Sequence, residues 1–273
     1  MSHDVRTDEL KRALVAPFGP YAALEVVPST GSTNADLIAA AARDAPDRSV
    51  LIAGEQTAGR GRRSREWVSP PSSGVYLSVL LRPAEVPAAR LGGLALVAGV
   101  ALVRAARDAA GVDAVLKWPN DLLAGPDRAK CAGVLSEAVP GGAGVVVGIG
   151  LNVERSPVEI PPGPGGLPAT SLAECGAVTT DRTTIAGAVL AAFAQLEAAW
   201  REAGGDLEAS GVLAGYRDAC GTLGQRVRVE LPDGTDRTGV AADVDAGGAL
   251  VIKAEDGTES VVSAGDVVHL RAR

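Results

Sequence analysis

The feature that most constrains the fold is a change of sequence pattern near residue 220. Ahead of it, strand-like apolar runs alternate with helix-length segments. Beyond it, short strand-like segments are separated by tight turns at Pro232-Asp233-Gly234, Asp245-Ala246-Gly247-Gly248 and Asp256-Gly257. Strands and turns at this spacing are typical of a small β-barrel of about five strands. The pattern therefore predicts two domains, residues 1–220 and residues 221–273.

Two helices are expected to dominate the core of the first domain. Residues 91–110 are rich in apolar side chains and end at Gly111, and residues 181–203 repeat apolar side chains at helical spacing. Strands are predicted at residues 50–53, 74–81, 130–137 and 145–153. The apolar run at residues 91–103 is too short to cross a bilayer, so we expect no membrane association.

The residue counts disfavour several classes of site. The chain carries 26 basic and 33 acidic residues, a formal net charge of −7, which disfavours binding to nucleic acid. Its three cysteines form no close pair, as expected for a reduced, cytoplasmic protein without a disulfide framework or zinc site. The two histidines, His3 and His269, lie near opposite ends, so we expect neither a histidine-centred triad nor a multi-histidine metal site.

An arginine-rich loop is the clearest candidate for chemistry. Arg60, Arg62, Arg63 and Arg65 fall within six residues, with Gly61 between the first two. Glycine permits a sharp bend or close approach to a ligand, and guanidinium groups suit carboxylate and phosphate oxygens. The segment predicts a mobile loop that closes over a small anion. A solvated face or a nucleic-acid patch is the alternative interpretation.

A polar cluster precedes that loop in the chain. Thr33 and Asp36 fit a capping box at the start of a helix. Free N–H groups at a helix start, together with Ser32, Thr33 and Asn34, could hold a polar ligand head group. The alternative is a helix cap with no further role.

Three further motifs adjoin predicted strands. Pro119-Asn120-Asp121 is a turn signal whose carboxylate could hold Mg²⁺. Lys130 begins an apolar strand, where it is either solvated or presented to an anion in a cleft. In Gly148-Ile149-Gly150-Leu151-Asn152, the glycines either form bulges or let a ligand ring lie against the backbone.

Taken together and in this order, the motifs resemble those of biotin–protein ligases. The resemblance rests on residues 59–67, 117–121, 130–137 and 148–152, and extends from about residue 25 to the end of the chain. Two positions depart from the family pattern, since Ser64 replaces a usual Gly and Cys131 a usual Leu. The resemblance implies an α+β fold. A mixed β-sheet flanked by helices, as in class II aminoacyl-tRNA synthetases, would be followed by a C-terminal SH3-like β-barrel.

The resemblance also implies an activity. The carboxylate of biotin would attack the α-phosphate of ATP, which enters with Mg²⁺, and release pyrophosphate. A lysine of a biotin carboxyl carrier domain would then attack biotinyl-5′-AMP. The winged helix of bifunctional, DNA-binding members is missing from the chain, so the enzyme-only type is expected, as a monomer or a homodimer.

The family motifs assign roles to particular residues. Arg60, Arg62 and Lys130 would be catalytic. Biotin or its adenylate would contact Ser32, Thr33, Asn34, Gln56, Arg60, Gly61, Arg62, Lys130, Gly133 and Gly150. ATP would contact Trp67, Asn120, Asp121 and Asn152, with Asp121 also facing Mg²⁺.

Three rival functions stay open. A lipoate or octanoate ligase would share the catalytic fold, although residues 59–67 with residues 117–121 favour biotin. An SH3-like binding module with a degenerate ligase domain is disfavoured by the retained charged residues. A biotin-responsive repressor is disfavoured by the missing winged helix and the acidic net charge.

Overall fold

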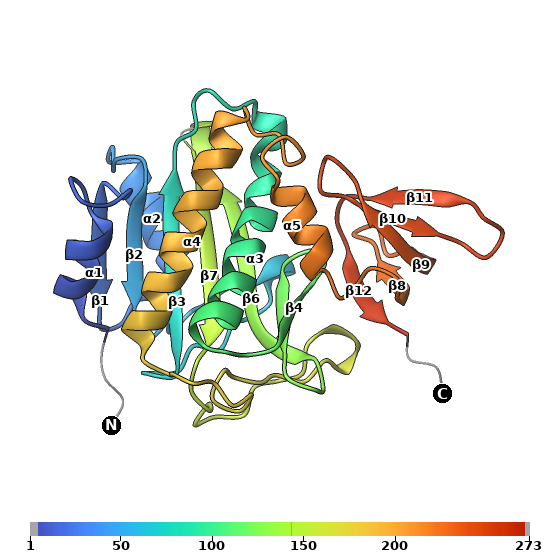
Figure 1. Cartoon of the computed structure of the whole chain (residues 1–273), viewed down its shortest axis with the longest axis horizontal. Helices are drawn as coiled ribbons and strands as arrows, with labels where there is room; N and C mark the ends of the chain where they lie inside the picture. The colour runs from blue at the N-terminus through green and yellow to red at the C-terminus, as the bar shows by residue number, and fades with distance from the viewer. Residues whose placement is uncertain (1–4, 143, 271–273) are drawn as a thin grey trace.

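A seven-stranded mixed sheet forms the centre of the computed structural model, which describes residues 5–142 and 144–270 (Figure 1). The strand order is β1-β2-β3-β7-β6-β5-β4. The strands are β1 (Ala23–Val27), β2 (Ser49–Ala53), β3 (Gly74–Leu81), β4 (Ala114–Lys117), β5 (Asp121–Ala124), β6 (Ala129–Ala138) and β7 (Val145–Asn152). β1 and β2 are parallel, whereas the other neighbouring pairs are antiparallel. The predicted mixed sheet is confirmed.

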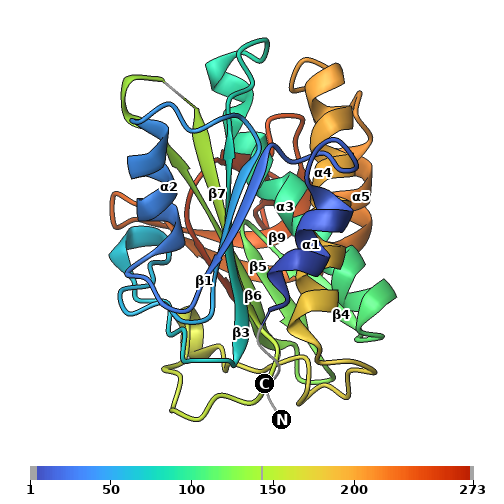
Figure 2. The same ribbon diagram turned by 90° about the vertical axis from the view of Figure 1, so that its left-hand side faces the viewer.

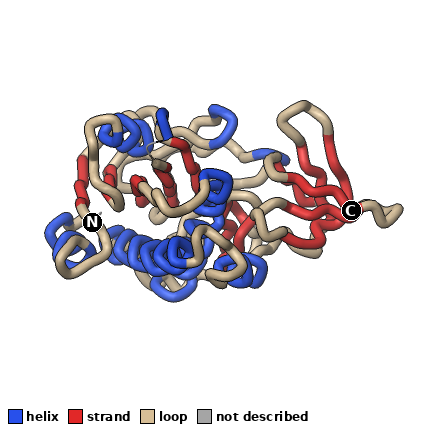
Figure 3. Tube along the Cα trace, turned by 90° about the horizontal axis from the view of Figure 1, so that it is seen from above, coloured by secondary structure: helices blue, strands red, loops and turns tan. Residues whose placement is uncertain are grey.

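Helices cover both faces of this sheet (Figure 2). One face carries α1 (Thr7–Leu14), α3 (Leu94–Arg104), α4 (Arg182–Glu202) and α5 (Val212–Ala219), and the other carries α2 (Thr33–Ala41). Figure 3 shows helices of the first group as a layer beside the strands. Because both faces are covered, every residue of β3 is buried. This is why the sequence of β3 is a nearly continuous apolar run without alternation.

The long apolar helix differs in extent from its prediction. A 3-10 turn at Ala88–Gly93, α3 and a π-helical turn at Ala105–Ala109 follow one another without a break. The resulting helix, Ala88–Ala109, and α4 are each long and apolar enough to cross a membrane. The apolar stretch was expected to be too short to cross a bilayer, and this expectation about its length was wrong. Most of each apolar stretch is buried, 61% and 56%, so their hydropathy reflects packing in the core.

The start of α2 also differs from its prediction. Ser32 is the N-cap, and its hydroxyl accepts a hydrogen bond from the N–H of Ala35 at 3.5 Å. Thr33 is already the first helical residue. Thr30 donates a hydrogen bond to the carboxylate of Asp36. The predicted capping box of Thr33 and Asp36 is therefore wrong.

The C-terminal part of the chain forms an antiparallel sheet at one end of the central sheet (Figure 1). Its strands are β8 (Arg226–Glu230), β9 (Asp236–Val244), β10 (Leu250–Lys253), β11 (Glu259–Val262) and β12 (Asp266–His269), in the order β11-β10-β9-β8-β12. Trp118, between β4 and β5, donates its indole N–H to the carbonyl of Gly248 at 3.0 Å. The five predicted strands are confirmed. The boundary near residue 220 stays a prediction, and it falls between α5 and β8.

Candidate active site

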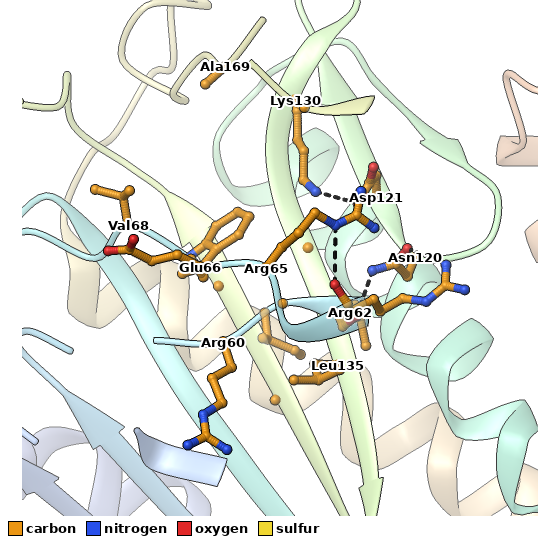
Figure 4. A pocket seen from close by; sticks show the side chains of 18 of the residues that line it. Arg60, Arg62, Arg65, Glu66, Val68, Asn120, Asp121, Lys130, Leu135 and Ala169 are labelled. Atoms are coloured by element: carbon orange, nitrogen blue, oxygen red, sulfur yellow. Dashed lines mark hydrogen bonds and ion pairs between the residues drawn. The ribbon is translucent and has the colours of Figure 1, made fainter. Parts of the chain in front are cut away.

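The predicted site residues gather around one cavity of about 320 Å³. It lies between the start of α2, the arginine loop and strands β5 to β7, as Figure 4 shows for ten of its residues. The lining includes each residue that the motifs singled out: Ser32, Thr33, Asn34, Gln56, Arg60, Gly61, Arg62, Trp67, Asn120, Asp121, Lys130, Gly133, Gly150 and Asn152. The fold therefore brings together residues up to 120 positions apart in the chain.

Uncharged polar groups form one end of the cavity. Gln56 Oε1 accepts hydrogen bonds from both the backbone N–H and the hydroxyl of Thr33, each at 3.0 Å. Gln56 Nε2 donates to Ser69 Oγ, also at 3.0 Å. These contacts fix the orientation of the Gln56 amide and the Thr33 hydroxyl beside the N-cap Ser32.

A second layer of polar side chains holds that end in place. The hydroxyl of Ser78 is fully buried and lies 2.7 Å from Thr33 Oγ1 and 2.6 Å from Asn34 Oδ1. Asn34 Nδ2 donates to Glu137 at 2.6 Å and to the carbonyl of Leu135 at 3.2 Å. Since protein groups engage both ends of the Asn34 amide, its contacts favour a positioning role over the predicted ligand contact.

A pair of glycines forms the floor of the cavity. Gly133 in β6 and Gly150 in β7 are opposite partners, and the indole of Trp67 lies against them. A Cβ atom at Gly150 would lie 2.4 Å from Trp67 Nε1, and one at Gly133 would lie 3.2 Å from Trp67 Cζ3. The glycines therefore permit a ring to lie against the backbone, and that ring is Trp67 itself. Trp67 Nε1 is buried without a hydrogen-bond partner among the described residues.

Cationic groups surround one carboxylate at the other end. Lys130 Nζ lies 2.7 Å from Asp121 Oδ1 and 5.4 Å from the centre of the Trp67 ring. Lys117 Nζ lies 3.9 Å from Asp121 Oδ2. Burial lowers the pKa of the Lys117 ammonium, an effect that Asp121 opposes. An added anion would therefore stabilise the charged form of Lys117.

The arginine loop folds back on itself as a short hairpin. Gly61 N–H donates to the carbonyl of Arg65 at 2.7 Å, and Trp67 N–H donates to the carbonyl of Gly59 at 2.9 Å. Arg62 Nη1 donates to Asn120 Oδ1 at 3.2 Å, and burial lowers the pKa of this guanidinium. Figure 4 shows Arg60 pointing away from Arg62 and Asn120. The side chains of the two arginines with predicted catalytic roles therefore lie in different parts of the cavity.

Comparison with known proteins identifies the family. Residues 24–154 match the biotin/lipoate A/B protein ligase family, and residues 222–270 match the biotin protein ligase C-terminal domain. The chain is 42% identical to the biotin–[acetyl-CoA-carboxylase] ligase of Mycobacterium tuberculosis, over 96% of this chain and 94% of that protein. The chain belongs to the biotin–protein ligase family.

Two further relatives agree with this membership. The bifunctional ligase/repressor BirA of Bacillus subtilis is 31% identical over 88% of this chain and 71% of its own length. The biotin protein ligase of Aquifex aeolicus in complex with biotin and ATP superposes with a TM-score of 0.75 at 26% identity, over 92% of this chain and all of that one. The resemblance to biotin–protein ligases and the predicted fold class are therefore confirmed.

The surroundings of Asp121 do not favour its predicted role as a Mg²⁺ ligand in this ligase-family chain. Two ammonium groups already contact its carboxylate. Among residues 5–142 and 144–270, no group of three or more His, Cys, Asp or Glu side chains could hold a metal ion. Proteins that bind Mg²⁺ through one carboxylate rely on substrate phosphates for further ligands.

Histidine does not line the cavity of this ligase-family chain. His269 Nε2 lies 3.1 Å from the hydroxyl of Thr222, in the C-terminal domain. His3 lies outside the described residues. The expectation that the site uses no histidine stays a prediction.

Several lining residues were missed by the sequence interpretation. Asp266 of β12 reaches the cavity from the C-terminal domain, and residues 160–164 form part of its wall. Lys117, to which the sequence interpretation gave no role, also lines the cavity. A buried serine within the apolar β3 run was the one local signal that could have identified Ser78.

Proposed function

We infer that this chain is an ATP-dependent biotin–protein ligase. It forms biotinyl-5′-AMP from biotin and ATP, then transfers biotin to a lysine of a biotin carboxyl carrier domain. The observation that carries the inference is the cationic lining of the cavity, where Arg60, Arg62, Arg65, Lys117 and Lys130 outnumber the carboxylates of Glu66, Asp121 and Asp266. In a chain with a net charge of −7, this local excess of positive charge indicates an anionic ligand.

The division of the cavity matches an acid with a polar head group. Thr33 and Gln56 offer hydrogen-bonding groups for the ureido ring, and the glycine floor with Trp67 offers an apolar surface for the ring and tail of biotin. We propose that the carboxylate of biotin then points toward Lys130.

The first step needs charge neutralisation rather than a base. A carboxylate oxygen of biotin forms a bond to the α-phosphorus of ATP, the bond to the β-phosphate oxygen breaks, and pyrophosphate leaves. The nucleophile is already an anion, which removes the need for an imidazole. Lys130, Lys117 and Arg62 would hold the reacting oxygens close together and offset their mutual repulsion.

In the second step, the reactive mixed anhydride transfers its acyl group to the carrier domain. The amine nitrogen of the carrier lysine attacks the acyl carbon, AMP leaves with the bridging oxygen, and the extra amine proton passes to solvent. We propose that Arg60, Gly61 and Arg62 fold over the adenylate until the carrier arrives. Excluding water in this way protects the anhydride from hydrolysis.

The remaining assignments are also proposals. Asn120 fixes Arg62, and Asn152, which donates to the carbonyl of Thr170 at 2.9 Å, borders the region proposed for ATP. Mg²⁺ would enter bound to ATP. We expect a cytoplasmic enzyme, monomeric or dimeric, that does not bind nucleic acid.

Intact mass of a purified apo carrier domain tests the proposal. With this protein, biotin and MgATP, we expect a single biotinyl adduct that disappears when ATP is omitted. Lys130→Gln should abolish this adduct, whereas Lys253→Gln, a change at the exposed last residue of β10, should retain it. An adduct with lipoate or octanoate but not biotin would support the rival ligase, and no adduct with any acid would support the binding module.

A further inference from the structure

A carboxylate of the C-terminal domain holds the arginine loop. Asp266, the first residue of β12, is 11% exposed at its side chain. Its Oδ2 accepts a hydrogen bond from Arg63 Nη1 at 2.8 Å, and its Oδ1 accepts one from Arg65 Nη2 at 2.7 Å. Each carboxylate oxygen thus binds a different arginine of the loop. Charge-assisted contacts of this kind are stronger than those between neutral groups.

The contact extends from Asp266 to the catalytic end of the cavity. Arg65 Nε donates to the carbonyl of Arg62 at 3.1 Å (Figure 4). Arg62 in turn donates to Asn120 at 3.2 Å. Asp266 therefore holds the backbone of Arg62 through Arg65, whereas Asn120 holds the side chain of Arg62.

The loop conformation requires such an external contact. Arg63 and Ser64 have φ values of 54° and 57°, both in the left-handed region that residues other than glycine adopt at a cost. Two consecutive residues of this kind persist where surrounding contacts stabilise them. One ion pair to Asp266 comes from Arg63, the first of these two residues, and the other comes from Arg65, which directly follows the second.

The C-terminal domain also contacts a second wall of the cavity. Val268 of β12 packs against Gly165, where an added Cβ would lie 2.7 Å from Val268 Cγ1. Asp266 and Val267 line the cavity themselves. β12 therefore contacts both the arginine loop and the proline-rich wall of the cavity.

From these contacts we propose that Asp266 is a positioning residue that holds the arginine loop closed over the acyl-adenylate, so that the C-terminal domain sets how long the adenylate stays bound. The proposal rests on the proposed ligase function. Asp266 acts through Arg63 and Arg65 and needs no contact with the reacting atoms. Its loss should therefore change the release of adenylate much more than its formation.

Release of adenylate from Asp266→Asn tests this proposal. The protein is loaded with biotin and ATP radiolabelled at the α-phosphate, unlabelled ATP is added, and loss of bound label is followed. We expect the ratio of release rate to formation rate to rise about tenfold, as expected for losing one charge-assisted pair. Asp266→Glu should restore part of the retention. Asp236→Asn, a matched change at an exposed residue of β9, should leave the ratio unchanged.

A second variant and a cleavage assay without ligands distinguish failure of the Asp266 proposal from failure of the proposed ligase function. Arg63→Gln combined with Arg65→Gln breaks the same contact from the loop side and should raise release to a similar extent. In the absence of ligands, trypsin should cut Asp266→Asn within residues 60–63 about tenfold faster than the parent. A folded variant, of either type, that releases adenylate at the parent rate would overturn the proposal. If the parent forms no adenylate, the ligase function itself fails, whereas the trypsin result still reports on the contact.

Discussion

Replacing Gly150 with alanine should disrupt the floor of the cavity. The added methyl would lie 2.4 Å from Nε1 and 2.5 Å from Cε2 of Trp67, well inside van der Waals contact. Single atoms of the indole cannot move independently, because the ring is rigid. Lys130 Nζ also lies over the ring, 5.4 Å from its centre. The indole must therefore move into the cavity. Overpacking of this kind costs about 1–3 kcal/mol, which corresponds to about 5- to 150-fold weaker biotin binding.

Gly133→Ala provides the matched control. Its added methyl would lie 3.2 Å from Trp67 Cζ3, a distance that a shift of a few tenths of an ångström relieves. We expect Gly133→Ala to weaken binding by less than about fivefold. Calorimetric titration with biotin measures both affinities, and thermal unfolding separates a local effect from loss of the fold. Equal affinities for the two variants would refute the argument that the indole is confined against Gly150.

Three further changes have defined outcomes. Ser64→Gly should relieve the cost of a left-handed residue, about 1 kcal/mol, and slow adenylate release up to about fivefold; faster release would contradict this. Ser78→Ala should remove the hydrogen bond to buried Asn34 Oδ1 and one of the two hydrogen bonds of Thr33 Oγ1, which keeps its bond to Gln56, and should cost about 1–3 kcal/mol of unfolding free energy, with a raised KM for biotin; an unchanged melting temperature would contradict the role of Ser78. Burial raises the pKa of Asp266, but hydrogen bonds from Arg65 and Arg63 outweigh it, so the pKa lies below its ordinary value. The ion pairs of Asp266 therefore stabilise the loop fully at any pH above the ordinary pKa of an aspartate. This stabilisation is lost only as the pH falls through the lowered pKa of Asp266. Loop hydrogen exchange, corrected for its intrinsic pH dependence, should therefore stay constant from about pH 8 to about pH 5, and a rise within that range would contradict the ion pairs.

Local patterns predicted much of the fold and the lining of the cavity. The limits of β3 were predicted to the residue, since an apolar run between a Gly-containing turn and a proline leaves few alternatives. Gly150 was singled out because glycine lets a ring lie against the backbone, whereas Gly133 was assigned through the family resemblance, and the ring that lies against both is Trp67. Such features depend on neighbours within one strand or one turn, which the sequence displays directly.

Contacts between distant segments could not be predicted in the same way. Asp266 lies 201 positions from Arg65, and nothing in the short segment around it distinguishes it from other strand-end carboxylates. The start of α2 was misassigned because Thr33 and Asp36 fit a capping pattern, whereas Asp36 bonds to Thr30. The start of the apolar helix was predicted at residue 91 because the 3-10 turn at Ala88–Gly93, which precedes α3, carries no strong apolar pattern at its beginning. For Asp266 and Asp36, a partner outside the local pattern decided the structure.

The fate of the carboxylate oxygens of biotin tests the account most directly. Biotin labelled with heavy oxygen in its carboxylate is incubated with this protein, MgATP and an apo carrier domain, and the released AMP is examined by mass spectrometry. If the carboxylate attacks the α-phosphorus beside Lys130, one labelled oxygen must remain with AMP when the carrier lysine takes the acyl group. Carrier biotinylation accompanied by unlabelled AMP would contradict the acyl-adenylate chemistry proposed for this cavity.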